Sequence, residues 1–319
     1  MRALVLSDIH NKIEPIHLLR TKERNEFDMI LVGGDIGCEI AKEFCQILDS
    51  FSCPTFCVYG NWDGDLDYTT QLSRSCVLVH HAIHECGGYF VTGFSGCPTY
   101  WGKNPFHLEE DHRLRDRHTE ILSALADAEH AGAIAEKVVA KECRKKRQRL
   151  YVKTPDRKTK AYRERRHRIE LWQEREVKRI REGADDIRSS KAFAQYLEDR
   201  SASGRRTLTR NRDALVNLIN RSGIDQRRLI IMTHERLYRL EDDGISPLLH
   251  VFGHIHEYKH TKFKGTSYLN AAAIDTSHIE FFDGRQPLPN GYCRVTIANT
   301  TISVERRLLY DELSGPPPT

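Results

Sequence analysis

The chain has 319 residues, of which 39% are hydrophobic and 29% charged, with 20 glycines and 11 prolines. This length and composition fit one large globular domain or two modest ones, and they exclude collagen-like, mucin-like and wholly disordered chains. No stretch approaches the roughly 18 apolar residues of a membrane span. The first strand-like run is short and is followed by the charged Asp8. It lacks the apolar stretch and the cleavage site of a signal peptide. We therefore expect a cytoplasmic protein without a transmembrane segment.

The nine cysteines are an odd number, include no Cys-x-x-Cys pair and mostly lie within apolar runs. This pattern indicates buried reduced thiols rather than disulfides or a zinc knot.

The net charge of +4 hides an uneven distribution. Residues 103–212 contain 30 Lys/Arg and 19 Asp/Glu, a net charge of +11, whereas the remainder contains 19 and 26, a net charge of −7. The composition shifts predict an α/β domain in two parts, an inserted basic helical segment and a disordered tail. The predicted boundaries are 1–104, 105–212, 213–311 and 312–319.

The first part alternates short apolar runs with stretches of helix length. The predicted strands are Ala3 to Leu6, Met29 to Val32 and Phe56 to Tyr59, and the predicted helices are Ile13 to Arg20 and Glu39 to Asp49.

Each of these strands ends at a polar or glycine-rich corner. Asp8 and Asp35 are 27 residues apart, and Asp35 and Asn61 are 26 apart, which is about one strand, one crossover helix and one loop each time. Successive parallel strands should therefore deliver Asp8, His10, Asp35 and Asn61 to the same carboxyl edge of one sheet, where open α/β sheets bind their ligands.

The pattern resumes after the basic segment. Leu229 to Met232 runs into His234, and Leu248 to Phe252 runs into His254 and His256. These two runs again predict strands that end in metal-binding side chains. Three later runs predict a second, more antiparallel layer: Ser267 to Asn270, His278 to Phe282 and Val295 to Val304.

The basic segment predicts two helices, Ala133 to Lys153 and Lys160 to Glu182, joined by a turn at 154–157. We call residues 133–182 the basic hairpin. Its two helices should face each other through thin apolar stripes. The expected stripe residues are Ile134, Val138, Val139 and Leu150 on the first helix, and Tyr162, Ile169, Trp172, Val177 and Ile180 on the second.

Between Arg144 and Arg181 there are 17 Lys/Arg and five acidic residues, a net charge of +12 in 38 residues. Such an excess repels itself without an anionic partner, and a phosphodiester backbone supplies regularly spaced negative charge. We expect this segment to bind nucleic acid, while a solvated helix face, an acidic protein partner, an anionic membrane surface or a homo-oligomer contact are the alternatives. The expected nucleic-acid-binding residues are Arg144, Lys145, Lys146, Arg147, Arg149, Arg163, Arg165, Arg166 and Arg168.

The order of five short motifs resembles the calcineurin-like metallophosphoesterase family. The motifs are Asp8-Ile9-His10, Gly34-Asp35, Gly60-Asn61-Trp62-Asp63, Thr233-His234 and Gly253-His254-Ile255-His256. The resemblance implies a four-layer α/β/β/α sandwich, here interrupted by the basic hairpin, with a dinuclear metal site. By position it implies that one ion is bound by Asp8, His10 and His256 and the other by Asn61, His234 and His254, with Asp35 as the bridge.

This mixture of carboxylate, amide and imidazole ligands suits transition metals better than magnesium or calcium. We expect two divalent ions, with manganese first and iron, zinc, cobalt or nickel as alternatives. A bridging hydroxide would then attack a phosphoester in line, so that Asp35, Asn61 and His234 carry the chemistry.

One position departs from the family pattern, since Trp62 stands where many members have histidine. An indole cannot transfer a proton at neutral pH, so esters with good leaving groups are favoured unless His80 or His81 supplies the proton. Trp62 could alternatively stack on a base of the substrate or simply pack the loop.

We expect a metal-dependent phosphodiesterase or nuclease that acts on nucleic acid or nucleotides. The alternatives are a phosphomonoesterase or cyclic-nucleotide phosphodiesterase on a small substrate, and a catalytically weak scaffold of the same fold.

Overall fold

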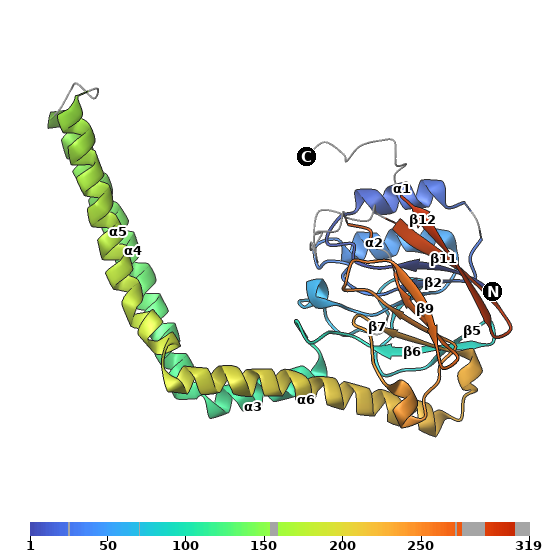
Figure 1. The fold of residues 1–319 in the computed structure, drawn as a ribbon. Coiled ribbons are helices and arrows are strands. Elements are labelled where there is room, and N and C mark those ends of the chain that lie inside the picture. The colour runs from blue at the N-terminus through green and yellow to red at the C-terminus, as the bar shows by residue number, and fades with distance from the viewer. Residues whose placement is uncertain (25, 70, 154–158, 272, 276–290, 310–319) are drawn as a thin grey trace. The chain divides into compact units, whose positions relative to one another are not determined.

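A computed structural model gives the fold of the chain (Figure 1). It describes all residues except 25, 70, 154–158, 272, 276–290 and 310–319. The turn predicted at 154–157, the strand predicted at 278–282 and the tail predicted at 312–319 lie outside the described residues. The chain divides into two compact units, one formed by 1–108 and 204–319 and the other by 109–203.

The first unit contains two six-stranded sheets. In the first sheet β1, β2, β3 and β4 are parallel neighbours, and β11 pairs antiparallel with both β1 and β12. The predicted strands near residues 3, 29 and 56 are confirmed as β1, β2 and β3. The strands in spatial order are β12 (Thr301–Leu308), β11 (Gly291–Ala298), β1 (Arg2–Leu6), β2 (Met29–Val32), β3 (Thr55–Cys57) and β4 (Cys76–Leu78).

In the second sheet β6, β7, β8 and β10 are parallel, with an antiparallel strand at each edge. The strands predicted near residues 229, 248 and 267 are confirmed as β7, β8 and β10. Strand β10 was expected in a more antiparallel layer, but it pairs parallel with β8 and antiparallel with β9. The strands in spatial order are β5 (His84–Cys86), β6 (Tyr89–Phe94), β7 (Leu229–Thr233), β8 (Leu249–Phe252), β10 (Thr266–Asn270) and β9 (Lys259–Phe263).

The run Val295 to Val304 was expected in a second antiparallel layer, and this expectation is wrong. The run contains the turn of the β11–β12 hairpin, which extends the first sheet beside β1. Only Asn299 and Thr300 separate the two strands, and Asn299 has a φ of 56°. Asparagine tolerates this left-handed conformation, so two tightly paired strands form where one was expected.

Three apolar clusters separate four layers. Alternate residues of β1 face opposite sides: Val5 packs between the two sheets with Met232 of β7, whereas Leu4 packs with Phe44 of α2 on the outer face of the first sheet. On the outer face of the second sheet Ile231 packs with residues of helix α6 such as Leu215. The first unit is therefore an α/β/β/α sandwich, as the family resemblance implied.

Two helices and four short helical turns of the first unit connect the strands of these sheets. Strand β1 leads through α1 to β2, and β2 leads through α2 to β3, so both connections are parallel crossovers. The helices are α1 (Glu14–Lys22) and α2 (Ala41–Leu48), with single turns η1 (Asp49–Phe51), η2 (Asn61–Asp63), η3 (Gln226–Arg228) and η4 (Leu240–Asp243).

The second unit is helical. Helices α4 (Thr119–Lys153) and α5 (Lys160–Arg188) lie within it, while α3 (Pro105–Arg117) and α6 (Lys191–Ser222) each cross its boundary. Within the described residues no helix combines the length and apolar character that crossing a membrane requires.

Helices α4 and α5 form an antiparallel pair. Arg188 contacts Glu129 at 2.5 Å, and Arg181 contacts Glu136 at 2.7 Å. Further along the pair, Cys143 donates to Gln173 at 2.9 Å. Residues later in α4 contact residues earlier in α5, so the two helices run antiparallel. Helix α4 begins at Thr119 rather than at 133, because the alanine- and leucine-rich stretch before 133 contains no proline and the single Gly132 does not end the helix.

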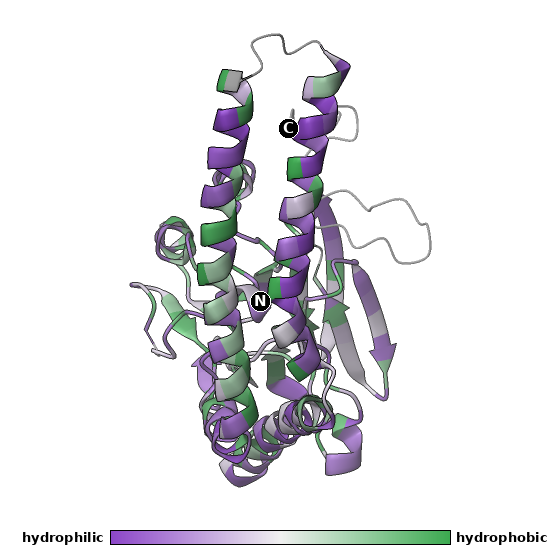
Figure 2. Cartoon of the chain, turned by 90° about the vertical axis from the view of Figure 1, so that its left-hand side faces the viewer, coloured by the Kyte–Doolittle hydropathy of each residue, from purple (hydrophilic) through white to green (hydrophobic). Residues whose placement is uncertain are grey.

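The apolar stripe predicted on α4 is partly wrong. Ile134 and Val138 are more than half exposed, whereas Cys143 and Leu150 are buried. The side of α4 that packs on α5 is therefore offset by about one residue from the predicted stripe. In Figure 2 hydrophilic residues cover much of both helices, with apolar residues interspersed.

Candidate metal centre

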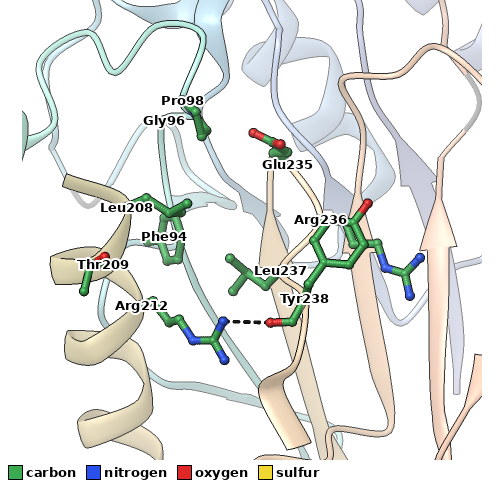
Figure 3. Close-up of a pocket in the computed structure, with 10 residues that line it drawn as sticks. All are labelled: Phe94, Gly96, Pro98, Leu208, Thr209, Arg212, Glu235, Arg236, Leu237 and Tyr238. Carbon is green, nitrogen blue, oxygen red and sulfur yellow. Dashed lines mark hydrogen bonds between the residues drawn. The ribbon is translucent and has the colours of Figure 1, made fainter. Parts of the chain in front are cut away.

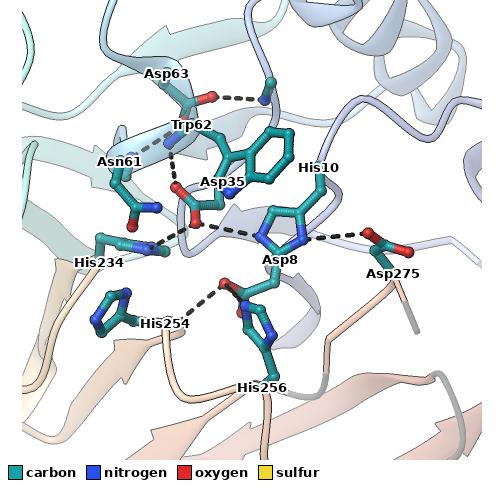
Figure 4. A network of polar contacts seen from close by, with 12 residues as sticks. Asp8, His10, Asp35, Asn61, Trp62, Asp63, His234, His254, His256 and Asp275 are labelled. Carbon is teal, nitrogen blue, oxygen red and sulfur yellow. Dashed lines mark hydrogen bonds and ion pairs between the residues drawn. The ribbon is translucent and has the colours of Figure 1, made fainter. Parts of the chain in front are cut away.

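The predicted ligands lie at the carboxyl ends of strands from both sheets (Figure 4). In the first sheet, Asp8 and His10 follow β1, Asp35 follows β2, and Asn61 follows β3. In the second sheet, His234 follows β7, and His254 and His256 follow β8. The structure brings all seven together at one edge of the sandwich, although the sequence spacing had placed only the first four on one sheet.

The backbone at this edge is held in an uncommon conformation. Positive φ angles are adopted by Asp8 (55°), His10 (51°), Asp35 (55°), His254 (71°) and His256 (53°). Each such residue costs about 1 to 3 kcal/mol. Backbone hydrogen bonds maintain it, since the amide of Asp8 donates to Gly34 and that of His10 to Asp35, both at 3.0 Å. Strain concentrated in five polar residues is typical of a functional site.

A first cluster contains Asp8, His10, Asp35 and His256. One ligand atom from each residue lies within 4.8 Å of the others. His10 Nε2 is 3.3 Å from Asp35 Oδ2, and His256 Nε2 is 3.5 Å from Asp8 Oδ1. The first three are buried and His256 is half-buried.

A second cluster contains Cys97, His234 and His254, again with ligand atoms within 4.8 Å of one another. Asn61 adjoins this cluster, because its Oδ1 atom lies 3.5 Å from Cys97 Sγ. His234 Nε2 is 3.2 Å from Asp35 Oδ2, the same oxygen that His10 approaches in the first cluster. The Asp35 carboxylate therefore lies between the two clusters.

Groups behind the ligands fix their orientation. The other ring nitrogen of His234 is 2.8 Å from the carbonyl of Gly33, and that of His10 is 3.3 Å from Asp275 Oδ2. The amide of Trp62 donates to Asp35 Oδ1 at 2.8 Å, which leaves Oδ2 facing both imidazoles. The Asp63 carboxylate accepts hydrogen bonds from the amides of Gly37 and Gly60. It therefore links the loops that follow β2 and β3.

The charges of the site are strongly coupled. Burial alone would lower the pKa of His10, but hydrogen bonds to Asp275 and Asp35 and the charge of Asp8 raise it to about 9. Burial alone would raise the pKa of Asp35, but the charge of His234, the hydrogen bond with His10 and the hydrogen bond from the Trp62 amide hold it well below its usual range. The pKa of Asp63 is raised to about 6 by burial and by the charge of Asp35.

Two buried atoms lack a hydrogen bond although they are strong ligands. Asp8 Oδ2 has no hydrogen-bond partner, and His234 Nε2 faces Asp35 without the geometry of a hydrogen bond. Buried polar atoms are normally satisfied, and a metal ion would satisfy both. The imidazole, carboxylate, amide and thiol donors suit divalent transition metals. The residues present therefore fit a pair of such ions.

Trp62 packs against the site with its indole stacked on His10, at a centroid distance of 4.7 Å and an interplanar angle of 27°. One face of the ring is thus covered by a protein side chain. His80 accepts the amide of Ser95, and His81 contacts Asn211 at 3.0 Å. Burial, with a smaller effect of His81, lowers the pKa of His80 to about 3.

The predicted nucleic-acid-binding residues lie on α4 and α5 in the other unit. Several of them contact other residues of the hairpin. Lys146 lies 3.2 Å from the centre of the Trp172 ring, and Arg166 and Arg147 contact Glu170 at 3.0 and 3.8 Å.

Sequence analysis missed Cys97 and Asp275. Cys97 is one of nine cysteines without a distinctive spacing, and Asp275 belongs to none of the five motifs. Asp275 reaches the site because the amides of Ile274 and Asp275 donate to the carbonyls of Ser7 and Asp8. This is a long-range contact that no local pattern reveals.

Comparison with known proteins gives only distant likenesses. No family model matches the chain, and no curated protein matches it. Among solved structures, a conserved uncharacterized protein from Streptococcus pneumoniae TIGR4, described as a predicted phosphoesterase, is 10% identical, with 97% of this chain and 89% of that chain covered and a TM-score of 0.36.

Wild-type Vps29 of Entamoeba histolytica, complexed with zinc, is 9% identical, with 97% and 100% covered and a TM-score of 0.33. Phosphopantetheinyl hydrolase of Mycobacterium tuberculosis is 11% identical, with 85% and 88% covered and a TM-score of 0.34. The strand pairing and the three apolar clusters of this chain define its fold.

Proposed function

We propose that the protein is a metal-dependent phosphoesterase. The observation that carries the proposal is the position of Asp35, whose Oδ2 atom faces His10 in one cluster and His234 in the other. A carboxylate shared in this way is suited to bridge two cations, and the calcineurin-like motif order implies the same role. When bound, the two ions would activate water and neutralise the charge of a phosphate group.

The protein groups would prepare the site for that chemistry. Asp8, His10 and His256 would hold one ion, and Asn61, His234 and His254 the other, with Cys97 as an additional donor. Asp275 and the carbonyl of Gly33 fix the ring orientations of His10 and His234, so both present Nε2 to Asp35.

Trp62, His80 and His81 are poor proton donors for a leaving group. The Trp62 indole cannot transfer a proton at neutral pH, and His80 and His81 are engaged with Ser95 and Asn211. Esters with good leaving groups should therefore react best. We propose manganese as the first metal to test.

For the substrate we propose a phosphodiester of nucleic acid or of a nucleotide. The support is the net charge of +12 between Arg144 and Arg181, which matches a polyanion. A small phosphomonoester or a cyclic nucleotide would use the same metal centre without needing this charge.

The test compares wild type with Asp35→Asn in a manganese-supplemented assay. The substrates are an aryl phosphodiester, a 2′,3′-cyclic nucleotide, an aryl monoester and single-stranded nucleic acid. We expect hydrolysis of the diesters by wild type and a loss of at least about 100-fold in the variant, since the variant removes the shared negative charge.

Metal content measured on the same samples provides the second readout. Two ions in wild type and fewer in Asp35→Asn are expected. Activity of the variant equal to wild type would overturn the bridging role, and a strict monoester preference would overturn the diester substrate. Two bound ions without hydrolysis of any ester would favour a scaffold.

A further inference from the structure

A cavity of about 240 Å³ is lined by residues that adjoin Cys97 and His234 in the sequence. Figure 3 shows its lining. Its walls come from the end of β6, the loop after it, the second half of α6 and the segment after β7. The residues that line it include Phe94, Leu208, Arg212, Glu235, Arg236 and Leu237.

The cavity and the metal centre share two segments of chain. Gly96 and Pro98 line the cavity, while Cys97 between them belongs to the second cluster. Thr99, the next residue, contacts His254 Nε2 at 3.2 Å. On the opposite wall Glu235 directly follows His234. The cavity therefore adjoins the second cluster through the loop after β6 and the segment after β7.

The walls are mainly apolar. Phe94 and Leu237 are buried, and Leu208 is half-buried with its side chain directed into the cavity. One acceptor adjoins this surface, because the half-buried carboxylate of Glu235 lines the same cavity. Flat apolar groups that carry a hydrogen-bond donor match such a lining.

The two arginines of the cavity are already engaged. Arg212 binds Asp243 at 2.9 Å and donates to the carbonyls of Tyr238 and Arg239 at 2.7 and 2.6 Å. The guanidinium of Arg236 lies over the rings of Tyr238 and Tyr268, 4.9 and 4.3 Å from their centres. The cavity therefore offers an apolar surface and an acceptor, while the donors of Arg212 are committed to protein groups.

We propose that this cavity is the subsite for a nucleobase of the substrate. The inference rests on the proposed phosphoesterase function and specifies its substrate class. Adenine, cytosine and guanine each combine a flat ring with an exocyclic amino group that can donate to a carboxylate. The ring would pack between Leu208 and Leu237, and its amino group would donate to Glu235.

The test measures binding separately from hydrolysis. Saturation-transfer NMR is recorded on the manganese-free full-length protein with adenosine as the probe and ribose as the control. We expect saturation of the base protons of adenosine and none of ribose. Absence of base saturation would overturn the inference.

Leu208→Trp fills the cavity and should abolish the adenosine signal. Its matched control is Leu197→Trp, which places the same side chain on α6 in the other unit, at a partly exposed position. Glu235→Gln should weaken adenosine binding about tenfold, since it removes a charged hydrogen-bond acceptor. Equal binding by Leu208→Trp and Leu197→Trp would overturn the site.

The Asp35→Asn variant distinguishes the two proposals. If the phosphoesterase function fails but the cavity binds bases, the variant and wild type will both bind adenosine and neither will hydrolyse esters. If the function holds but the cavity does not bind bases, wild type will hydrolyse esters and Leu208→Trp will do so equally well on nucleotide and non-nucleotide substrates.

Discussion

His10 and Asp275 lie 265 residues apart in the sequence, yet His10 Nδ1 is 3.3 Å from Asp275 Oδ2. The contact directs His10 Nε2 toward Asp35. A histidine held by a carboxylate on one nitrogen and facing a ligand cluster with the other is the usual arrangement of an imidazole metal ligand. Asp275 is therefore a positioning residue in the proposed centre.

Removing this contact should weaken metal binding. We expect Asp275→Ala to lower the affinity for the first ion by about 10- to 100-fold, as measured by titration of the metal-free protein. Asp275→Asn retains an acceptor oxygen and should lose less. Asp199→Asn is the matched control, because Asp199 contacts His118 at 2.9 Å in the other unit. Unchanged affinity in Asp275→Ala would contradict the positioning role.

Cys97 should influence which metal the second cluster prefers. A thiolate is a soft donor that favours zinc over manganese, whereas a hydroxyl does not. We expect Cys97→Ser to reduce the preference for zinc over manganese by about tenfold or more, measured by competition between the two ions. Cys86→Ser is the control, since Cys86 is only half-buried and contacts Asp28. An unchanged preference would show that the thiol does not bind the ion.

The sequence predicted the parts of this site that follow a local rule. Asp8, Asp35 and Asn61 recur at the spacing of a strand, a helix and a loop, and parallel strands then place them at one edge. The partners Cys97 and Asp275 follow no such rule. They arrive through loops whose paths depend on the packed sandwich, so their roles required the three-dimensional structure.

The same distinction applies to the fold. Strands β1, β2, β7 and β8 are short buried runs and were recognised. Strand β5 was missed because His84, Glu85 and Cys86 form neither an apolar nor an alternating run. On α4 the apolar residues Ile134 and Val138 are more than half exposed, since the side of the helix that contacts α5 carries Cys143 and Leu150 instead.

His250 should make stability fall in acid. It is fully buried on β8, and its Nε2 lies 2.9 Å from Thr233 Oγ1. Burial, and to a lesser extent the charge of Arg236, lowers its pKa from 6.5 to about 3. Between pH 6.5 and about pH 3, His250 is protonated in the unfolded chain but neutral in the folded chain. The stability present above pH 6.5 is therefore lost as the pH falls toward 3.

The expected contribution is a loss of about 2 kcal/mol in the free energy of unfolding between about pH 7 and about pH 5. Urea unfolding at both values measures it. His250→Gln should lose about 2 kcal/mol less than wild type over this interval, whatever its stability at neutral pH. The control is His17→Gln, since His17 is exposed on α1. An equal loss in wild type and His250→Gln would contradict the assignment.

The basic hairpin should bind polynucleotides without affecting small substrates. Arg163, Arg165, Arg166 and Arg168 are exposed on α5, and reversing their charges would replace attraction to phosphates by repulsion. We expect the fourfold Arg→Glu variant to lose at least about tenfold in affinity for single-stranded oligonucleotides and to show a shallower salt dependence.

Turnover of a small aryl diester by this variant should remain at the wild-type rate, because this substrate has no polyanionic backbone for the hairpin to bind. The matched control reverses Arg227, Arg228, Lys259 and Lys262, which are exposed in the first unit. Binding isotherms at several salt concentrations and initial rates on both substrates provide the measurement. Equal losses of oligonucleotide binding and aryl-ester turnover would indicate damage to the fold. No loss of either would contradict nucleic-acid binding and favour a protein or membrane partner for the hairpin.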